Sequence, residues 1–321
     1  MQHSEQAPSP LALLETMMLI RAYEEALVGI AAGGSAPGTC TSVGQEAAAA
    51  GVVRALTPRD RILTNHRSAG HLLARGADPG RMIAEVLGKR TGYCKGKSGS
   101  LHISAAELGV VLTSTIVGGE LSLAPGVALA RTMTPGDDGI VAAFFGDGAA
   151  CEGVFHESLN LAVVWKLPIL YVCENNEWQA FVHRRETMPM AHVRDWAAAH
   201  GLVAETVDGN DAEAVHAAAA RLAARIRATG EPAFLETLTY RTRGHYEPDD
   251  QFYVDPAELA AWQARDPIEL LANRLRADGR LDDARLAQIR ARVRALIDEA
   301  VAFANASPYP DTAELFTDVY A

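Results

Sequence analysis

The sequence predicts an α/β protein in which a parallel sheet carries helices on both faces, with helical extensions at the N- and C-terminal ends. Three short apolar runs predict the sheet. Residues 140–145, 168–173 and 233–238 show little polar alternation, which is typical of strands buried on both faces. Helical patterns at 153–165 and 212–227 separate these runs. Strands that alternate with single helices predict parallel neighbours, because each helix carries the chain back across one face of the sheet.

The other elements follow from local patterns. Helices are predicted where apolar residues recur at helical spacing, and short strands where an apolar piece stands between turn signals. The predicted helices cover residues 11–31, 44–55, 68–75, 79–87, 119–132 and 281–305, and the short strands lie near 62–63 and at 205–207. The segment 88–99, rich in glycine and basic residues, is predicted to be a mobile loop. We expect one domain over residues 1–321, with an N-terminal helical part at 1–60 and a C-terminal helical extension at 255–321.

The bulk composition argues against several classes of protein. The net charge of −11 gives no reason to expect a basic surface for nucleic acid. No apolar run reaches the roughly 18–20 residues that a membrane-spanning helix needs, and residues 1–10 lack the apolar centre of a signal peptide. The four cysteines form no Cys-x-x-Cys pair, so zinc and dithiol chemistry are not indicated. We expect a reducing, cytoplasmic location, with no membrane or nucleic-acid partner.

Two polar segments end predicted strands that follow one another along the chain. Gly146-Asp147-Gly148 follows the run 140–145, and Asn175-Asn176 follows the run 168–173. A right-handed crossover puts such strands side by side or nearly so, and open α/β sheets bind ligands at the carboxyl ends of their strands. A carboxylate, an amide oxygen and diphosphate oxygens suit Mg²⁺. The amides of Gly148 and Ala149, at the start of a helix, suit an anion.

A simpler explanation exists for Gly-Asp-Gly, because these residues also form tight turns. Taken alone, the tripeptide favours the turn. The buried strand before it, the single helix after it and the second strand ending in Asn-Asn together favour a cofactor site held by Asp147.

Further motifs, taken in order, make the chain similar to a known family. Gly-Asp-Gly followed by Asn-Asn resembles the thiamine diphosphate fingerprint. The chain also contains, in sequence, Gly44-Gln45-Glu46-Ala47, His66-Arg67, Lys95-Gly96-Lys97-Ser98-Gly99-Ser100-Leu101-His102, Ile116-Val117-Gly118, Tyr240-Arg241-Thr242-Arg243-Gly244-His245, Arg265-Asp266-Pro267-Ile268, and Ser307-Pro308 through Asp318-Val319-Tyr320. From about Leu11 to Tyr320 it resembles the alpha subunit of the decarboxylating first component of 2-oxo acid dehydrogenase complexes, a family with pyruvate, acetoin and branched-chain members. The resemblance implies the thiamine diphosphate-binding fold, with thiamine diphosphate and Mg²⁺ as cofactors.

The resemblance also implies roles for single residues. Asp147 and Asn176 would bind Mg²⁺ through their side chains, and Trp178 through its backbone carbonyl. The diphosphate would meet the residues that follow Asp147, and a planar bidentate donor, Arg67, would pair with a phosphate. His245 would lie close to the reacting carbon and act as general acid or base, since imidazole titrates near neutrality.

The complete set of expected cofactor contacts is larger. Thr115 and Val117 would contact the aminopyrimidine ring through backbone groups, and Arg241 would lie with His245 on a loop over the cofactor. The expected cofactor-binding residues are Cys40, His66, Arg67, Thr115, Val117, Asp147, Gly148, Ala149, Asn176, Trp178, Arg241 and His245, with His245 and His66 as the catalytic pair.

Several positions depart from the family pattern. Cys40 stands where pyruvate- and acetoin-type members usually place a histidine near the cofactor, and His66 stands where the family often has tyrosine. Thr115 replaces a common glycine, and Glu120 replaces glutamine or glycine. These departures leave the substrate open. The remaining candidates, His71 and His102, are expected to be structural or loop residues, and the two lysines of the 88–99 loop either order it near the phosphates or are simply solvated.

A second chain is implied by what this one lacks. In the family, a glutamate on a pyrimidine-binding domain promotes deprotonation of the cofactor, and no second sheet pattern follows here. A beta subunit would therefore supply it, in a heterotetramer of two alpha and two beta chains. The resemblance implies cleavage of a small 2-oxo acid or acetoin, with the acyl group passed to a lipoyl-bearing transacylase. Two alternatives stay open: a subunit of a split transketolase-like carboligase, and a non-catalytic regulatory paralogue.

Overall fold

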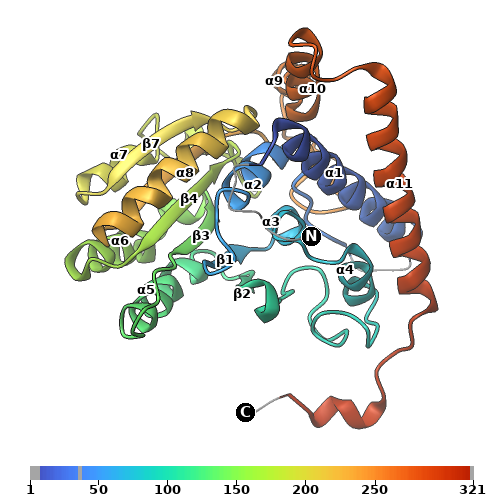
Figure 1. Cartoon of the computed structure of the whole chain (residues 1–321), viewed down its shortest axis with the longest axis horizontal. Helices are drawn as coiled ribbons and strands as arrows, with labels where there is room; N and C mark the ends of the chain where they lie inside the picture. Colours follow the sequence, from blue (N-terminus) through green and yellow to red (C-terminus); the bar gives the residue numbers. More distant parts are fainter. Residues whose placement is uncertain (1–7, 35–37, 319–321) are drawn as a thin grey trace.

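A computed structural model describes residues 8–34 and 38–318 of the chain. Val319 and Tyr320, which end the last motif above, lie outside the described residues. The sheet and its covering helices occupy one side of the molecule, and helices from both ends of the sequence occupy the other (Figure 1).

The central sheet has six parallel strands in the order β2-β1-β3-β4-β8-β7. Their bounds are β1 Arg61–Asn65, β2 Val110–Ser114, β3 Val141–Gly146, β4 Ile169–Asn175, β7 Val203–Asp208 and β8 Ala233–Leu238. β3 pairs with β4 from Val141 opposite Ile169 to Gly146 opposite Glu174, so the two strands end at the same edge. Asp147 and Asn176, which follow these ends, are therefore brought together as expected.

Each face of the sheet has its own helices. Alternate side chains of β3 point to opposite faces: Ala143 and Phe145 belong to one core, Ala142 and Phe144 to the other. The first core is closed by α5 (Gly119–Thr132), α6 (Gly153–Trp165) and α7 (Arg194–Ala199), and the second by α2 (Glu46–Val53) and α8 (Ala212–Thr229). Because both faces are covered, the strand carries no alternating polar residues.

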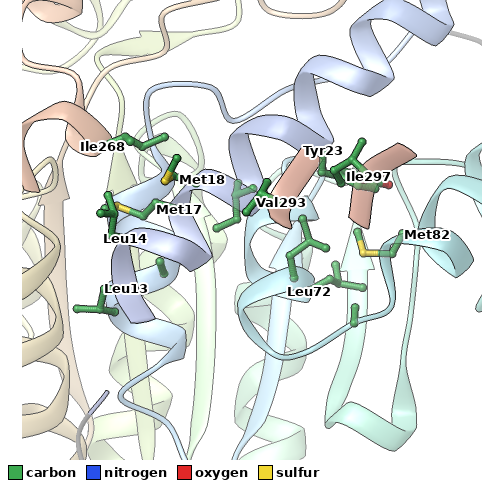
Figure 2. Close-up of a cluster of buried hydrophobic side chains, with 14 of the residues drawn as sticks. Leu13, Leu14, Met17, Met18, Tyr23, Leu72, Met82, Ile268, Val293 and Ile297 are labelled. Atoms are coloured by element: carbon green, nitrogen blue, oxygen red, sulfur yellow. The ribbon is translucent and has the colours of Figure 1, made fainter. Parts of the chain in front are cut away.

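The ends of the sequence share a third core. α1 (Pro10–Ala32) packs against α3 (Ala69–Ala74), α10 (Pro267–Ala277) and α11 (Asp283–Ala306), and α11 also packs against α4 (Pro79–Val86). Tyr23, Met82 and Ile297 come from α1, α4 and α11 and meet in this core (Figure 2). None of the helices within 8–34 and 38–318 combines the length and apolarity needed to cross a membrane.

The predicted fold class is confirmed, and the strongest patterns give the closest bounds. The helices predicted at 119–132 and 153–165 and the strand at 233–238 match the structure residue for residue. The sequence pattern does not predict β2, α7 or the two-residue strands β5 (Trp178–Gln179) and β6 (Val182–His183). β2 was missed because it is an edge strand whose short apolar piece ends in Thr113 and Ser114. The order is completed by α9 (Pro256–Gln263) and the 3-10 helices η1 (Ala106–Leu108), η2 (Ala149–Cys151), η3 (Arg184–Glu186) and η4 (Thr312–Phe316).

The segment 88–99 was expected to be a mobile loop, but hydrogen bonds to a buried carboxylate hold it in place. Glu85 is fully buried near the end of α4. Its carboxylate accepts hydrogen bonds from the backbone amides of Cys94 at 2.8 Å, Gly96 at 2.9 Å and Ser98 at 2.8 Å. Three bonds to one charged acceptor hold the loop against the third core, because charge-assisted hydrogen bonds are about twice as strong as neutral ones.

Candidate active site

A cavity of about 530 Å³ opens at the carboxyl ends of the strands, with Asn65, Ser114, Gly146 and Glu174 in its wall. Of the residues expected to bind the cofactor, all but Asp147 line this cavity: Cys40, His66, Arg67, Thr115, Val117, Gly148, Ala149, Asn176, Trp178, Arg241 and His245. Segments far apart in the sequence thus converge on one space.

Asp147 lies between two residues that line the cavity, Gly146 and Gly148. It is fully buried, and its Oδ1 accepts a hydrogen bond from the backbone amide of Asn176 at 3.3 Å. Oδ2 is also buried and has no hydrogen-bond partner within residues 8–34 and 38–318. Burial raises the pKa of Asp147, because an unpaired charge is costly away from water. A cation at Oδ2 would remove that cost.

The groups next to Asp147 fit Mg²⁺. The side-chain amide of Asn176 donates to Gln45 Oε1 at 3.1 Å, and its Oδ1 accepts from the amide of Trp178 at 3.2 Å. The orientation of this amide is therefore fixed beside Asp147. Carboxylate, amide and backbone carbonyl oxygens are the hard ligands that Mg²⁺ takes in proteins, usually together with phosphate oxygens and water.

Other groups around the cavity suit an anion. The backbone amides of Gly148 and Ala149 make no hydrogen bond within the described part of the chain. Arg67 and Arg241 are both buried, and Arg67 is held by donating to the carbonyl oxygens of Thr41 at 2.6 Å and His245 at 2.8 Å. Burial, with the nearby Arg241 cation, lowers the pKa of Arg67 to about 10. Free amides and two buried arginines favour a diphosphate.

His245 and His66 lie near these arginines. Their ring centroids are 6.0 Å apart at an interplanar angle of 73°. His245 Nδ1 is 3.2 Å from Arg67 Nη2 and 3.4 Å from Arg241 Nη1. Because guanidinium groups only donate, Nδ1 accepts, and the neutral ring carries its proton on Nε2. Burial and the two arginines lower the pKa of His245 to about 4 and that of His66 to about 3, so both rings are neutral near pH 7.

Two glycines let the backbone reach this geometry. Gly118 has φ +75°, and a Cβ there would lie 2.8 Å from Val154 Cγ1, so only glycine fits the turn from Val117 into α5. Gly44 has φ +93°, and a Cβ there would lie 2.7 Å from Thr242 Cγ2. The Gly44-Gln45 segment therefore packs against the segment that carries Arg241.

Several cavity residues were not assigned a site role from the sequence. The sequence places Gln45 in the motif Gly44-Gln45-Glu46-Ala47, and the structure shows that it fixes the side-chain amide of Asn176. Glu120, a departure from the family pattern, is buried, lines the cavity, and has an Oε2 with no partner in the described part of the chain. Glu174 also lines the cavity and accepts a hydrogen bond from His71. These roles depend on contacts between distant segments, which a linear pattern does not show.

The remaining candidates lie away from the cavity wall. The ring nitrogens of His71 meet Thr64 Oγ1 at 2.7 Å and Glu174 Oε1 at 2.9 Å in the interior. Lys95 and Lys97 donate to Asp318 at 2.9 and 2.8 Å. Both lysines therefore bind the C-terminal segment and do not reach the expected phosphate site.

Comparisons with known proteins identify similar chains. The family model described as "Dehydrogenase E1 component" matches residues 15–313. The alpha subunit of acetoin:2,6-dichlorophenolindophenol oxidoreductase from Bacillus subtilis is 39% identical over 312 residues, which cover 97% of this chain and 93% of the relative. The protein of the same name from Cupriavidus necator is 39% identical over 313 residues, with the same coverage. The pyruvate dehydrogenase E1 component subunit alpha of Rhizobium meliloti is 37% identical over 305 residues, 94% of this chain and 87% of the relative.

Proposed function

The chain belongs to the dehydrogenase E1 component family, and from this membership we propose that it is the alpha subunit of a thiamine diphosphate-dependent dehydrogenase acting on acetoin or a small 2-oxo acid such as pyruvate. Relatives named for acetoin and for pyruvate support the two substrates almost equally, at 39% and 37% identity. The observation that carries the proposal is the convergence of the expected cofactor residues around one cavity next to the partnerless oxygen of Asp147.

Family membership implies thiamine diphosphate, and we assign its Mg²⁺ to the side chains of Asp147 and Asn176 and the carbonyl of Trp178. The partnerless Oδ2 of Asp147 supports this assignment. Gly148 and Ala149 would receive the diphosphate through their free amides, and Arg67 would add a cation. When bound, thiamine diphosphate supplies the electron sink for cleavage of the bond beside the substrate carbonyl.

The chain's own residues would hold protons and exclude water. His245 is kept neutral by burial and by Arg67 and Arg241, so its Nε2–H can donate a hydrogen bond to a substrate oxygen. His66, 6.0 Å from it between ring centroids, would serve the same cavity. Thr115 and Val117 would position the aminopyrimidine ring through backbone groups, while Cys40 replaces an imidazole with a smaller, weaker hydrogen-bonding group.

The catalytic unit would need a beta subunit. The names of the relatives support this, because they are called alpha subunits. The cavity wall supports it as well, because Ile116 is 73% exposed and Val117 56% exposed. Exposed apolar side chains beside a polar cavity are typical of a surface that another chain covers. We place the subunit in a heterotetramer of two alpha and two beta chains, which passes its acyl product to a lipoyl-bearing transacylase.

The proposal is tested by co-purifying the chain with its beta partner and measuring reduction of 2,6-dichlorophenolindophenol with saturating thiamine diphosphate and Mg²⁺. We expect turnover with acetoin, pyruvate or a branched-chain 2-oxo acid, and acyl transfer to lipoamide. No turnover with any of them would contradict the dehydrogenase assignment. Ketol transfer without oxidation would support the carboligase, and absence of cofactor binding would support the regulatory paralogue.

A further inference from the structure

A second, much smaller cavity lies behind the wall that Cys40 and His66 form. Its volume is about 10 Å³, close to the least that holds one water molecule. Its polar lining residues are Tyr23, Glu24, Thr39, Cys40, His66, Ser68 and Ser100. Cys40 and His66 also line the cofactor cavity, so these two side chains separate the two spaces. Tyr23 and Met82, two buried residues of the third core (Figure 2), also line the small cavity.

Glu24 on α1 is the acidic group of this small cavity. The residue is 1% exposed, and its Oε1 accepts hydrogen bonds from the amide of Ser42 at 3.0 Å and from its hydroxyl at 2.7 Å. Its Oε2 has no hydrogen-bond partner in the part of the chain that the structure describes. A water in the cavity would bond to Oε2 and to a ring nitrogen of His66, since buried waters typically satisfy otherwise unpaired polar groups.

We propose that Glu24 is a proton-holding residue that exchanges one proton with the cofactor cavity through a single water molecule and His66. This proposal rests on the proposed function. The carboxylic acid gives its proton to the water, and the water gives a proton to one ring nitrogen of His66. The other ring nitrogen gives its proton to a basic atom of the bound substrate. Glu24 is left as a carboxylate, the substrate gains one proton, and the reverse transfers restore both the acid and the original tautomer.

The charge states of the groups along this path fit the role. Burial raises the pKa of Glu24 to about 7, with a further rise from Glu46 that the bonds from Ser42 and the Arg67 cation oppose. The pKa of His66 is lowered to about 3 by burial, Arg67, His245 and Arg241. His66 is therefore a neutral relay that is not stably protonated, while Glu24 can hold or release a proton near neutral pH.

The other titratable groups around Glu24 do not replace it on this path. Burial raises the pKa of the adjacent Tyr23 far above neutrality, and burial also raises that of Cys40. Arg243 lies within electrostatic reach of Glu24, but the Glu247 carboxylate, its ion-pair partner, raises the pKa of this arginine. Tyr23, Cys40 and Arg243 therefore keep their protons where Glu24 titrates.

Infrared spectroscopy of the alpha–beta complex with thiamine diphosphate and Mg²⁺ tests the path without turnover. The C=O band of a protonated buried carboxyl should be lost with a midpoint near pH 7. Burial also raises the pKa of Glu120 and Glu177 to about 7, so the Glu24 band is read from the difference between the wild-type and Glu24→Gln spectra. That difference band should be present, and no such band should appear between wild type and Glu25→Gln, the exposed neighbouring glutamate. In D₂O, exchange of this carboxyl proton should slow on the order of 10²-fold in His66→Phe, the lower end of what a positioned proton-transfer group contributes. Unchanged exchange in His66→Phe, or an unchanged band in Glu24→Gln, would overturn the proposal.

Steady-state kinetics give a second readout. In the wild-type complex, kcat should fall as the pH rises through about 7, because Glu24 loses the proton that it donates. Glu24→Gln should lower kcat, leave KM nearly unchanged and abolish the fall of kcat above about pH 7. If Glu24 had a purely structural role, the variant would keep this fall, and that result would contradict the path. Absence of turnover in the wild-type complex would reject the proposed function, while the infrared exchange would still decide the proton path.

Discussion

Burial sets the charge of the polar residues around the cofactor cavity. Asp147 has a raised pKa and a partnerless oxygen, while His66 and His245 are kept neutral beside two buried arginines. Each of these states costs free energy in the isolated chain. Such perturbed groups concentrated in one cavity are typical of functional sites.

A His66→Gln variant tests this at one residue. In the folded wild-type protein the pKa of His66 is about 3, below the value of roughly 6.5 in the unfolded chain. Between these values the unfolded state binds more protons, so the wild-type free energy of unfolding falls as the pH falls from 7 to 5. The His66 contribution to this loss is up to about 2 kcal/mol. Urea unfolding at the two pH values should show a smaller loss in His66→Gln, and the same loss as wild type in the exposed control His102→Gln. Equal losses in all three proteins would contradict the neutral, buried ring.

Sequence could predict the residues that belong to ordered motifs, but not those that act through distant contacts. Asp147, Asn176 and Arg67 stand in recognisable segments with matching spacing. Gln45 acquires its role from Asn176, and Glu24 from Ser42 and a cavity that forms only in the folded chain. No local spacing encodes those contacts.

Among the elements, one buried carboxylate joins three that are distant in sequence. Asp60 precedes β1 and is fully buried. It accepts hydrogen bonds from the amides of Thr57 at 2.6 Å and Ile140 at 2.9 Å, and from Arg227 Nη2 at 2.5 Å. It thereby fixes the starts of β1 and β3 against the end of α8.

Asp60→Ala should therefore lower the free energy of unfolding by about 3–5 kcal/mol, because it leaves the partly buried Arg227 cation, the buried amide of Ile140 and the partly buried amide of Thr57 without their acceptor. Chemical denaturation measures this change. Asp138→Ala, which removes an exposed partner of Arg59, should change the free energy by at most about 1 kcal/mol. A similar small effect for both variants would show that Asp60 does not tie these elements together.

The loop 88–99 depends on Glu85 in a comparable way. Glu85→Gln replaces one acceptor oxygen with an NH₂ group and should free part of the amides of Cys94, Gly96 and Ser98. Hydrogen–deuterium exchange over 94–98 should then be at least about tenfold faster, since each bond to a charged acceptor contributes about 1.5–3 kcal/mol. The exposed control Glu107→Gln should leave this exchange unchanged. If Glu85→Gln also leaves the exchange over 94–98 unchanged, Glu85 does not anchor this loop.

At this scale the sequence predicts elements with strong periodicity and misses those set by their neighbours. α5, α6 and β8 carry clear patterns and have the predicted bounds. β2 lies at the edge of the sheet beside β1, and the short β5 and β6 pair with each other. Their pairing comes from tertiary placement, because so few residues carry almost no pattern of their own.

At the scale of the whole molecule, the two ends of the sequence pack on each other through α1, α10 and α11 (Figure 1). We propose that residues 1–321 fold as one domain, in which α1 carries Glu24 and helps to line the small cavity. Exposed Ile116 lies in the wall of the cofactor cavity, and the exposed ring of Phe181 lies 5.3 Å from that of His245 between centroids. We expect the beta subunit to cover these two exposed side chains and to complete the catalytic site.

The central claim is that Asp147 holds the metal of a magnesium–diphosphate cofactor in the alpha–beta complex. Titration calorimetry with thiamine diphosphate, with and without Mg²⁺, tests it most directly on wild type, Asp147→Asn and the exposed control Asp138→Asn. We predict Mg²⁺-dependent binding in wild type and control, and affinity at least about a hundredfold weaker in Asp147→Asn, since even residues that only support metal ligands affect affinity 10–100-fold. Binding of equal affinity in Asp147→Asn and wild type would contradict the account.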